Sequence, residues 1–175
     1  MAGVTIYGNP VLRQKGAPVL AVTDEIRALA AHMLEVMAKA EGIGLAAEQI
    51  GRTEALFVID IPAGRMKDNP GVSMPLVAVN PEIIGASDET DVEEEGCLSF
   101  PKLYVPVRRS EEIVLRYTDL NGMPQIVNAK GLFARAIQHE NDHINGVLLV
   151  DHMTATGKLQ HILLLKKLKR QGEGK

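Results

Sequence analysis

Two histidines, His139 and His143, lie four residues apart within the string QHENDH. Residues i and i+4 lie on one face of an α-helix, so both imidazoles can bind one metal ion. Glu140 is rotated by about 100° from His139 around the helix axis and can face the position that the ligands leave open. The spacing His-Glu-x-x-His therefore predicts two metal ligands and a general base that acts on a water molecule.

Two histidines make an incomplete site, because a catalytic metal usually takes three protein ligands and keeps one position open. Cys97 is the only cysteine of the chain and the only thiol that can complete the set. A lone cysteine is more often a small buried hydrophobe. Here Gly96 permits close backbone approach and Glu95 can orient a neighbouring ligand. We therefore expect Cys97, His139 and His143 to bind the metal, with Glu95 behind them.

Length, net charge and cysteine count exclude several classes of protein. The 175 residues are enough for one domain with a sizeable core, and a net charge of -3 gives no global sign of nucleic-acid binding. A single cysteine excludes an intramolecular disulfide and fits a reducing compartment. We find no signal-peptide pattern and no apolar run that could span a membrane. We therefore expect a cytoplasmic protein that does not contact the membrane.

Three segments are predicted to be helical from apolar residues that recur about every 3.6 positions. The first begins at Thr23 or Asp24, either of which can cap it, and ends near Gly42. The second carries the histidine pair and runs from about 132 to 145. The third spans about 156–169.

Apolar runs and alternations predict strands between the first two helices. They cover residues 55–60, 76–80 with an irregular edge to 86, 112–117, and 125–128 after an Asn-Gly turn. Pro101 and Pro106 interrupt the stretch between them. The acidic stretch 87–95 is expected to be a solvated loop. The order of elements indicates an α+β fold, with mixed or antiparallel sheets around a central metal-binding helix and a helix near each end.

Three strings in this order and spacing resemble the three motifs of peptide deformylase. They are GIGLAAEQ at 42–49, EGCLS at 95–99 and QHENDH at 138–143. Taken alone, the first string is typical of a helix end followed by a turn. Together the three are specific, and the likeness runs from about Ile6 to the last helix.

The resemblance implies one catalytic domain over residues 1–175. An N-terminal strap would occupy 1–22, and a C-terminal helix with a basic tail would occupy 156–175. The implied reaction is hydrolysis of the N-formyl group from formyl-Met at the start of new polypeptides, which releases formate. The implied substrates are N-formyl-Met peptides and nascent chains.

The resemblance also assigns roles to single residues. The implied metal ligands are Cys97, His139 and His143. Glu140 would take a proton from the attacking water and return one to the leaving amine. Gln49 and the backbone N–H of Leu98 would donate to the developing oxyanion, and loss of one such donor typically costs about 10² to 10³ in rate.

Substrate binding is implied for a further set of residues. They are Ile43, Gly44, Gly96, Leu132 and Ala136. Ile43 and Gly44 would pair with the substrate backbone as with an added strand, and the Met side chain would enter an apolar pocket near Leu132 and Ala136. Tyr104 departs from the pattern, because some family members have an arginine there that contacts the substrate chain.

A thiolate with two imidazoles suits several divalent metals. The resemblance implies Fe²⁺ as the physiological ion, with Zn²⁺, Ni²⁺ or Co²⁺ as substitutes. We expect a monomer. The family's work on nascent chains implies docking on the ribosome through the basic end of the last helix, although cations at a helix C-terminus also suit the helix macrodipole. The cations there are Lys166, Lys167, Lys169 and Arg170.

Two other functions compete with this one. A zinc peptidase of the His-Glu-x-x-His type would need a third ligand downstream, where only His152 and His161 remain as histidines. A metal-stabilised binding module without activity would typically have lost the glutamate, the cysteine or one histidine, all of which are present here.

Overall fold

The computed structural model describes residues 3–174. The helices are α1 (Asp24–Lys39), α2 (Gly131–Ile144), α3 (Ala155–Gln160) and α4 (Ile162–Glu173). The strands are β1 (Gly44–Ala46), β2 (Leu56–Ile59), β3 (Leu76–Ala86), β4 (Thr90–Gly96), β5 (Tyr104–Ser110), β6 (Glu112–Thr118) and β7 (Pro124–Lys130). Short 3-10 helices are η1 (Pro10–Arg13), η2 (Ala47–Ile50), η3 (Ala63–Arg65) and η4 (Leu149–Asp151). Residues 1, 2 and 175 of the predicted strap and tail lie outside the described residues.

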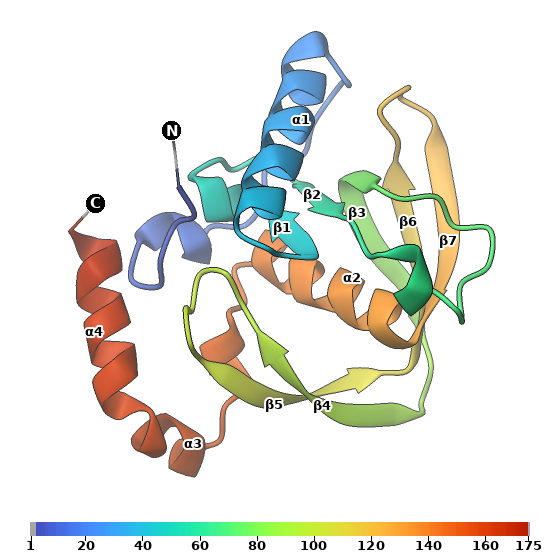
Figure 1. Ribbon diagram of the computed structural model, residues 1–175. Coiled ribbons are helices and arrows are strands. Elements are labelled where there is room, and N and C mark those ends of the chain that lie inside the picture. The colour runs from blue at the N-terminus through green and yellow to red at the C-terminus, as the bar shows by residue number, and fades with distance from the viewer. Residues whose placement is uncertain (1–2, 175) are drawn as a thin grey trace.

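The strands form two antiparallel sheets with α2 packed against both (Figure 1). The larger sheet has five strands in the order β1-β2-β3-β6-β7, and β4 and β5 form a separate hairpin. Strand β1 lies at one edge of the larger sheet and pairs only with β2, with Gly44 opposite Ile59. The α+β prediction, with sheets around the metal-binding helix, is confirmed.

The apolar face of α2 explains its central place. Phe133, Ala134 and Ile137 are fully buried in one cluster with residues of the larger sheet, among them Phe57 and Leu115. At about 1.5–3 kcal/mol for each large apolar side chain, this burial holds the helix in place.

The chain leaves α2 at Gly146, which has φ +70. A Cβ at this position would come within 2.7 Å of the Arg13 carbonyl oxygen, so glycine is needed there. The end predicted for this helix agrees with the structure.

Helix α1 also follows the sequence. The Thr23 side chain accepts a hydrogen bond from the Ile26 N–H at 3.5 Å and caps the helix. Ile26, Met33 and Met37 are buried against β2 and η2. The helix ends at Lys39, three residues before the predicted Gly42, and the string that follows forms β1 and η2 instead of a simple turn.

The acidic stretch 87–95 was wrongly expected to be a loop. Most of it is β4, which pairs with β5 from Thr90 opposite Ser110 to Gly96 opposite Tyr104. The acidic side chains are compatible with a strand because cations compensate them. Asp91 and Glu95 both bind Arg135.

Pro106 lies inside β5 and does not interrupt it. The hairpin has only two strands, so a residue without an N–H is tolerated on the open side.

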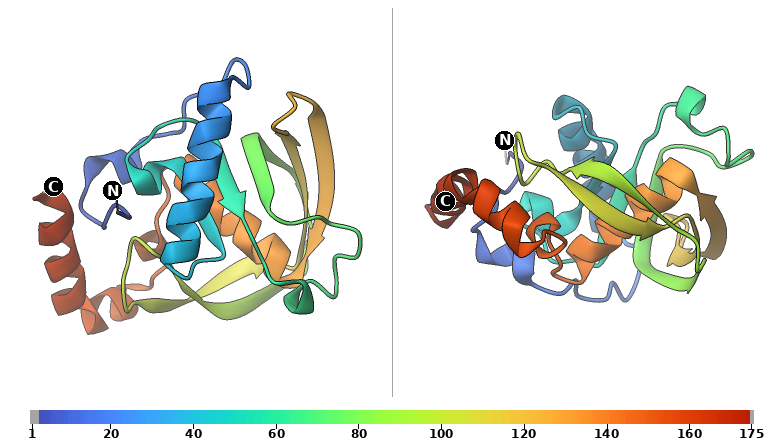
Figure 2. Two further views of the ribbon diagram at one scale, coloured as in Figure 1. Left: turned by 45° about the horizontal axis from the view of Figure 1, so that its top comes forward. Right: turned by 90° about the horizontal axis from the view of Figure 1, so that it is seen from below.

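The segment predicted to be one last helix forms two helices, α3 and α4, which are separated by the non-helical residue His161. After the break α4 lies beside the N-terminal segment at one end of the molecule (Figures 1 and 2). Leu168 is buried there, and Ile6 and Tyr7 pack against the same cluster. No helix within residues 3–174 is long and apolar enough to cross a membrane.

Candidate metal centre

The structure brings the three predicted ligands together. Cys97 follows the end of β4, and His139 and His143 come from consecutive turns of α2. Their ligand atoms all lie within 4.8 Å of one another, and Cys97 Sγ is 3.3 Å from His143 Nε2. Within residues 3–174, these three side chains are the one group of His, Cys, Asp or Glu residues whose ligand atoms are close enough together to hold a metal ion. A thiol and two imidazoles at this separation fit a divalent transition metal with an open position.

A tight turn presents Cys97 to the helix. The Phe100 N–H donates to the Cys97 carbonyl at 2.9 Å, which closes the turn after β4. Gly96 was expected to leave room for substrate or metal. Gly96 is exposed to solvent, and a Cβ on it would lie 2.9 Å from the Tyr104 ring on the neighbouring strand.

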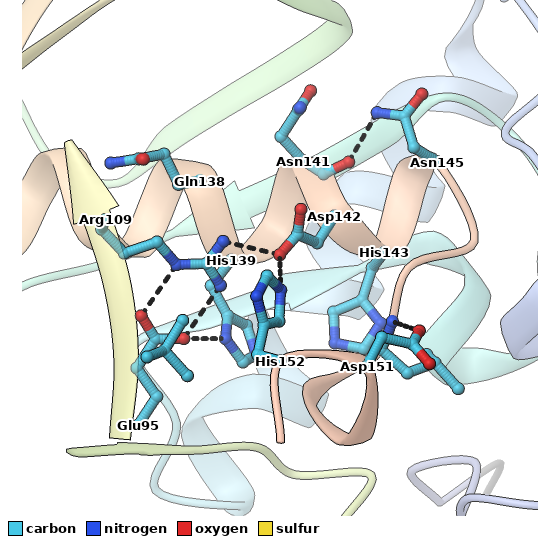
Figure 3. A network of polar contacts seen from close by, with 12 residues as sticks. Glu95, Arg109, Gln138, His139, Asn141, Asp142, His143, Asn145, Asp151 and His152 are labelled. Atoms are coloured by element: carbon cyan, nitrogen blue, oxygen red, sulfur yellow. Dashed lines mark hydrogen bonds and ion pairs between the residues drawn. The ribbon is translucent and has the colours of Figure 1, made fainter. Parts of the chain in front are cut away.

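Glu95 lies behind His139 and is almost fully buried. Its Oε2 accepts from His139 Nδ1 at 2.9 Å, and its Oε1 accepts from Arg109 Nε at 2.9 Å (Figure 3). The same Oε1 also accepts from Arg135 Nη1 at 2.7 Å. Burial raises the pKa of Glu95, but the hydrogen bonds from His139 and Arg109 outweigh it and hold the pKa well below its usual value. An ionised Glu95 accepts a hydrogen bond from His139 Nδ1–H, which keeps the proton on Nδ1 and leaves Nε2 free to bind metal.

His143 is held differently. Its Nδ1 is buried and has no hydrogen-bond partner among residues 3–174. Burial lowers the pKa of His143 well below its usual value, and the positive charge of Arg109 lowers it further. A neutral imidazole is the form that binds a metal ion, so the site also fits a metal on this side.

Glu140 is buried between α2 and β1. Burial raises the pKa of Glu140 to about 7, which is close to the value that suits a general base at neutral pH. A Cβ on Gly44 would overlap Glu140 Oε1. Glycine is therefore required at position 44 for the carboxyl group to pack directly on the β1 backbone.

The side-chain amide nitrogen of Gln49 lies next to the metal-ligand cluster. Its Oε1 accepts from the Ala46 N–H at 2.8 Å, which fixes the side chain. Its Nε2 lies 3.3 Å from Ser99 Oγ and 3.5 Å from Cys97 Sγ. The Leu98 N–H, next to Cys97, donates to no group among residues 3–174. Both predicted oxyanion donors thus lie beside the ligand cluster.

Three of the predicted substrate residues share one apolar cluster. Ala136 belongs to it, and Ile43 and Leu132 pack against it while partly exposed. The two downstream histidines do not complete the metal site, since His152 Nε2 instead lies 2.8 Å from Asp142 Oδ2.

Sequence reasoning missed four residues around the site. They are Glu48, Arg109, Arg135 and Asp142. Arg109 could have been found from its place in β5, where it shares the inward face with Val105 and Val107 and so needs an acidic partner. Glu48 carried no such signal.

Comparisons with known proteins agree with this geometry. The family model for polypeptide deformylase matches residues 1–159. A peptide deformylase of Rhodopseudomonas palustris (strain TIE-1) is 48% identical over 167 residues, 95% of this chain and 92% of that protein. One of Thermotoga sp. (strain RQ2) is 38% identical over 96% of this chain and 94% of that protein.

Solved structures of the same kind also match. An Arabidopsis thaliana peptide deformylase has a TM-score of 0.87 and 35% identity, over 98% of this chain and 92% of that one. The Thermotoga maritima enzyme has a TM-score of 0.80 and 37% identity, over 88% of this chain and 98% of that one. From its sequence, its fold and the order of its motifs, this chain belongs to the polypeptide deformylase family.

Proposed function

We propose that Cys97, His139 and His143 hold one divalent metal ion and that Glu140 moves the protons of the reaction. As a family member the chain is a hydrolase that removes the N-formyl group from the N-terminal formyl-Met of new polypeptides and releases formate. The observation that carries the proposal is the convergence of the three ligand atoms within 4.8 Å, beside a buried glutamate.

The chain's own groups supply the proton transfers. A bound metal ion would polarise the formyl group and lower the pKa of a water molecule. Glu140, with a pKa near 7, accepts a proton from the attacking water and then gives one to the leaving amine nitrogen. No cation forms an ion pair with its carboxyl group among residues 3–174, and burial raises its pKa more than the charges of His139 and Arg109 lower it.

Two donors would face the oxygen on which negative charge develops. Gln49 Nε2 is held by the Ala46 hydrogen bond to its own Oε1, so it needs no reorganisation during the reaction. The Leu98 N–H is free of partners among the described residues. Preorganised donors of this kind lower the barrier because their dipoles are already oriented.

The open edge of β1 suits the substrate backbone. Gly44–Ala46 pairs with β2 on one side only, so the other edge can accept an extended peptide as an added strand. The Met side chain would then lie against Ile43, Leu132 and Ala136, which already share an apolar cluster. Gly96, which is exposed at the end of β4, is proposed to lie close to the substrate chain.

Fe²⁺ is the proposed physiological metal, with Zn²⁺, Ni²⁺ or Co²⁺ able to replace it. The thiol and two imidazoles support a transition metal and do not select among these ions. Iron(II) beside a thiolate is open to oxidation, so the protein purified from cells should lose activity in air unless a reductant is present. Activity that stays constant in air would indicate another metal.

The wider setting is also proposed. We place the protein in the cytoplasm as a monomer of one catalytic domain over residues 1–175, supported by α4 packing on the N-terminal segment and by substrates that are new polypeptides. Ribosome docking is proposed through the exposed cations of α4. They are Lys166, Lys167, Lys169 and Arg170. Loss of ribosome binding at high salt would support this contact, and binding that does not change with salt would contradict it.

Formate release from formyl-Met-Ala-Ser by anaerobically purified protein tests the proposal. Release should stop when a chelator removes the metal and return when Fe²⁺ is added. The Cys97→Ala variant should neither retain the metal nor release formate. Cleavage of an internal peptide bond, or no release by protein shown to hold metal, would contradict the proposed site.

A further inference from the structure

A row of hydrogen-bonded side chains runs from the metal ligand His139 to His152, thirteen residues further along the chain (Figure 3). Glu95 binds His139 and Arg109, as described above. Arg109 Nη1 then donates to Asp142 Oδ2 at 2.6 Å, and the same oxygen lies 2.8 Å from His152 Nε2. The two ends of this row belong to different parts of the fold, α2 and the segment after η4.

We propose that His152 is a positioning residue for the metal centre, which acts through Asp142, Arg109 and Glu95 on the orientation of His139. The inference rests on the proposed metal site and deepens it. It assigns to His152 a role that its sequence position does not suggest, since the histidine lies outside all three family-like strings.

The chemistry of Asp142 fixes what His152 must do. A carboxylate oxygen that already accepts from an arginine can only accept again, so His152 Nε2 must carry a proton and donate it. Asp142 Oδ2 is therefore held between two donors, Arg109 Nη1 and His152 Nε2. His152 therefore helps to fix the position of the Asp142 carboxylate.

The position of the Asp142 carboxylate matters because Arg109 depends on it. The Arg109 side chain is 6% exposed and divides its donors between Glu95 and Asp142, whereas the Asp142 side chain is 23% exposed. Without His152, Asp142 can turn towards solvent and leave a buried Arg109 donor unpaired. Arg109 would then shift against Glu95, and Glu95 is the group that orients His139.

His152 lies where such control is possible. It directly follows η4 and lines a cavity of about 180 Å³ together with Tyr104, Met153 and His161. Its side chain is 27% exposed, so it forms the solvent side of a row whose middle, Arg109 and Glu95, is buried. A histidine that only stabilises the packing of η4 on α2 would make the same hydrogen bond to Asp142. The experiment must therefore distinguish a stabilising role from a role in positioning His139.

Three substitutions at position 152 and one at 161 separate them. His152→Gln keeps an amide donor near the place of Nε2, while His152→Asn is too short to reach Asp142. His152→Leu fills similar volume without a donor. His161→Leu is the matched control, because His161 lines the same cavity and lies outside the row. The Asn variant carries the test if the Leu variant does not fold.

Each protein is loaded with Co²⁺, and three quantities are measured: the rate of metal loss to a chelator, the visible spectrum of the cobalt site, and kcat and KM on formyl-Met-Ala-Ser. For His152→Leu and His152→Asn we expect metal loss about 10-fold faster, at the low end for residues behind metal ligands. The cobalt spectrum should change, and kcat should fall by a similar factor with KM unchanged. His152→Gln and His161→Leu should behave as the unsubstituted protein does.

Several results would overturn the proposal. One is an unchanged rate of metal loss and an unchanged spectrum in the Leu and Asn variants. That result would mean that the His152 hydrogen bond only stabilises the fold, whether or not the metal-free variants unfold more easily. Another is a Gln variant as impaired as the Leu variant, because the donated hydrogen bond would then not be the cause. Failure of the unsubstituted protein to hold cobalt or release formate would instead contradict the proposed function.

Discussion

Two buried glutamates, Glu95 in β4 and Glu48 in η2, show how similar burial can accompany pKa shifts in opposite directions. Glu95 accepts hydrogen bonds from His139, Arg109 and Arg135, and its pKa lies well below the usual value. Glu48 is fully buried, and neither of its carboxyl oxygens has a partner among residues 3–174. Burial raises the pKa of Glu48 to about 8, helped by the nearby charge of Glu140. Partners, and not depth, decide which carboxyl group is ionised.

Glu140 belongs with Glu48 in this comparison. It is buried, one of its oxygens is unpaired among the described residues, and burial raises its pKa to about 7. The two sides of the site are therefore specialised. The Glu95 side carries fixed charges that orient a ligand, and the Glu140 side carries carboxyl groups that can gain and lose a proton near neutral pH.

Among the three substitutions that compare the Glu95, Glu140 and Glu48 environments, Gly44→Ala is expected to have the largest effect. The added Cβ would overlap Glu140 Oε1, so the carboxyl group must move away from β1. A displacement of about 1 Å at a catalytic group can cost about 10² in rate, and we expect a loss of that size in kcat. Metal content should be unchanged. The control is Gly64→Ala, because a Cβ there meets nothing within 4 Å; equal rates in the two variants would contradict the packing argument.

On the other side, Glu95→Gln should mainly affect the metal. A neutral amide has one accepting oxygen where the carboxylate has two, and it carries no charge, so it cannot accept from His139 Nδ1 and also compensate the two arginines. We expect metal to be lost about 10- to 100-fold faster, measured by transfer to a chelator. Glu93→Gln is the control on the same strand, because that exposed side chain reaches Arg135 only at 3.4 Å. Equal retention in both variants would show that Glu95 does not orient the ligand.

The smallest effect concerns Glu48. Its pKa is raised from 4.5 to about 8 in the folded protein, so the folded state holds a proton that the unfolded state releases between these values. The free energy of unfolding should therefore fall as pH rises from about 4.5 to about 8. Glu48→Gln removes this dependence and should raise stability at pH 8 by about 2 kcal/mol, after allowance for the buried amide.

Urea unfolding of the metal-free protein at pH 5.5 and pH 8 measures this difference. The gap between the Glu48→Gln variant and the unsubstituted protein should be larger at pH 8. The same gap at both values would mean that Glu48 does not titrate between them.

Much of the fold is readable from the sequence because local rules decide it. The Thr23 cap, the apolar face of α2 and the Asn121-Gly122 turn each specify an element without help from distant residues. The acidic strand β4 could not be found this way. Glu93 and Glu94 are indeed exposed, but Glu95 is buried because Arg109 and Arg135, which are distant in sequence, compensate its charge.

The residues of the site also fall into those that the sequence predicts and those that only the tertiary structure reveals. Cys97, His139, His143 and Glu140 can be proposed from residue type and spacing, because metal ligation and general-base catalysis restrict both. Glu95 can be proposed as well, as a neighbour of Cys97, but the groups that set the ionisation of Glu95 and Glu140 cannot. Glu48 differs from Glu95 only in what the tertiary structure places around it.

Formate release by metal-loaded Glu140→Gln is the most direct test of the account. The amide keeps the size of the side chain and cannot accept or return a proton. With metal content measured in the same sample, we predict unchanged metal and a loss of about 10² to 10⁴ in kcat, as expected for removal of a general acid–base group. A variant that holds metal and releases formate within about tenfold of the normal rate would show that Glu140 is not the proton carrier.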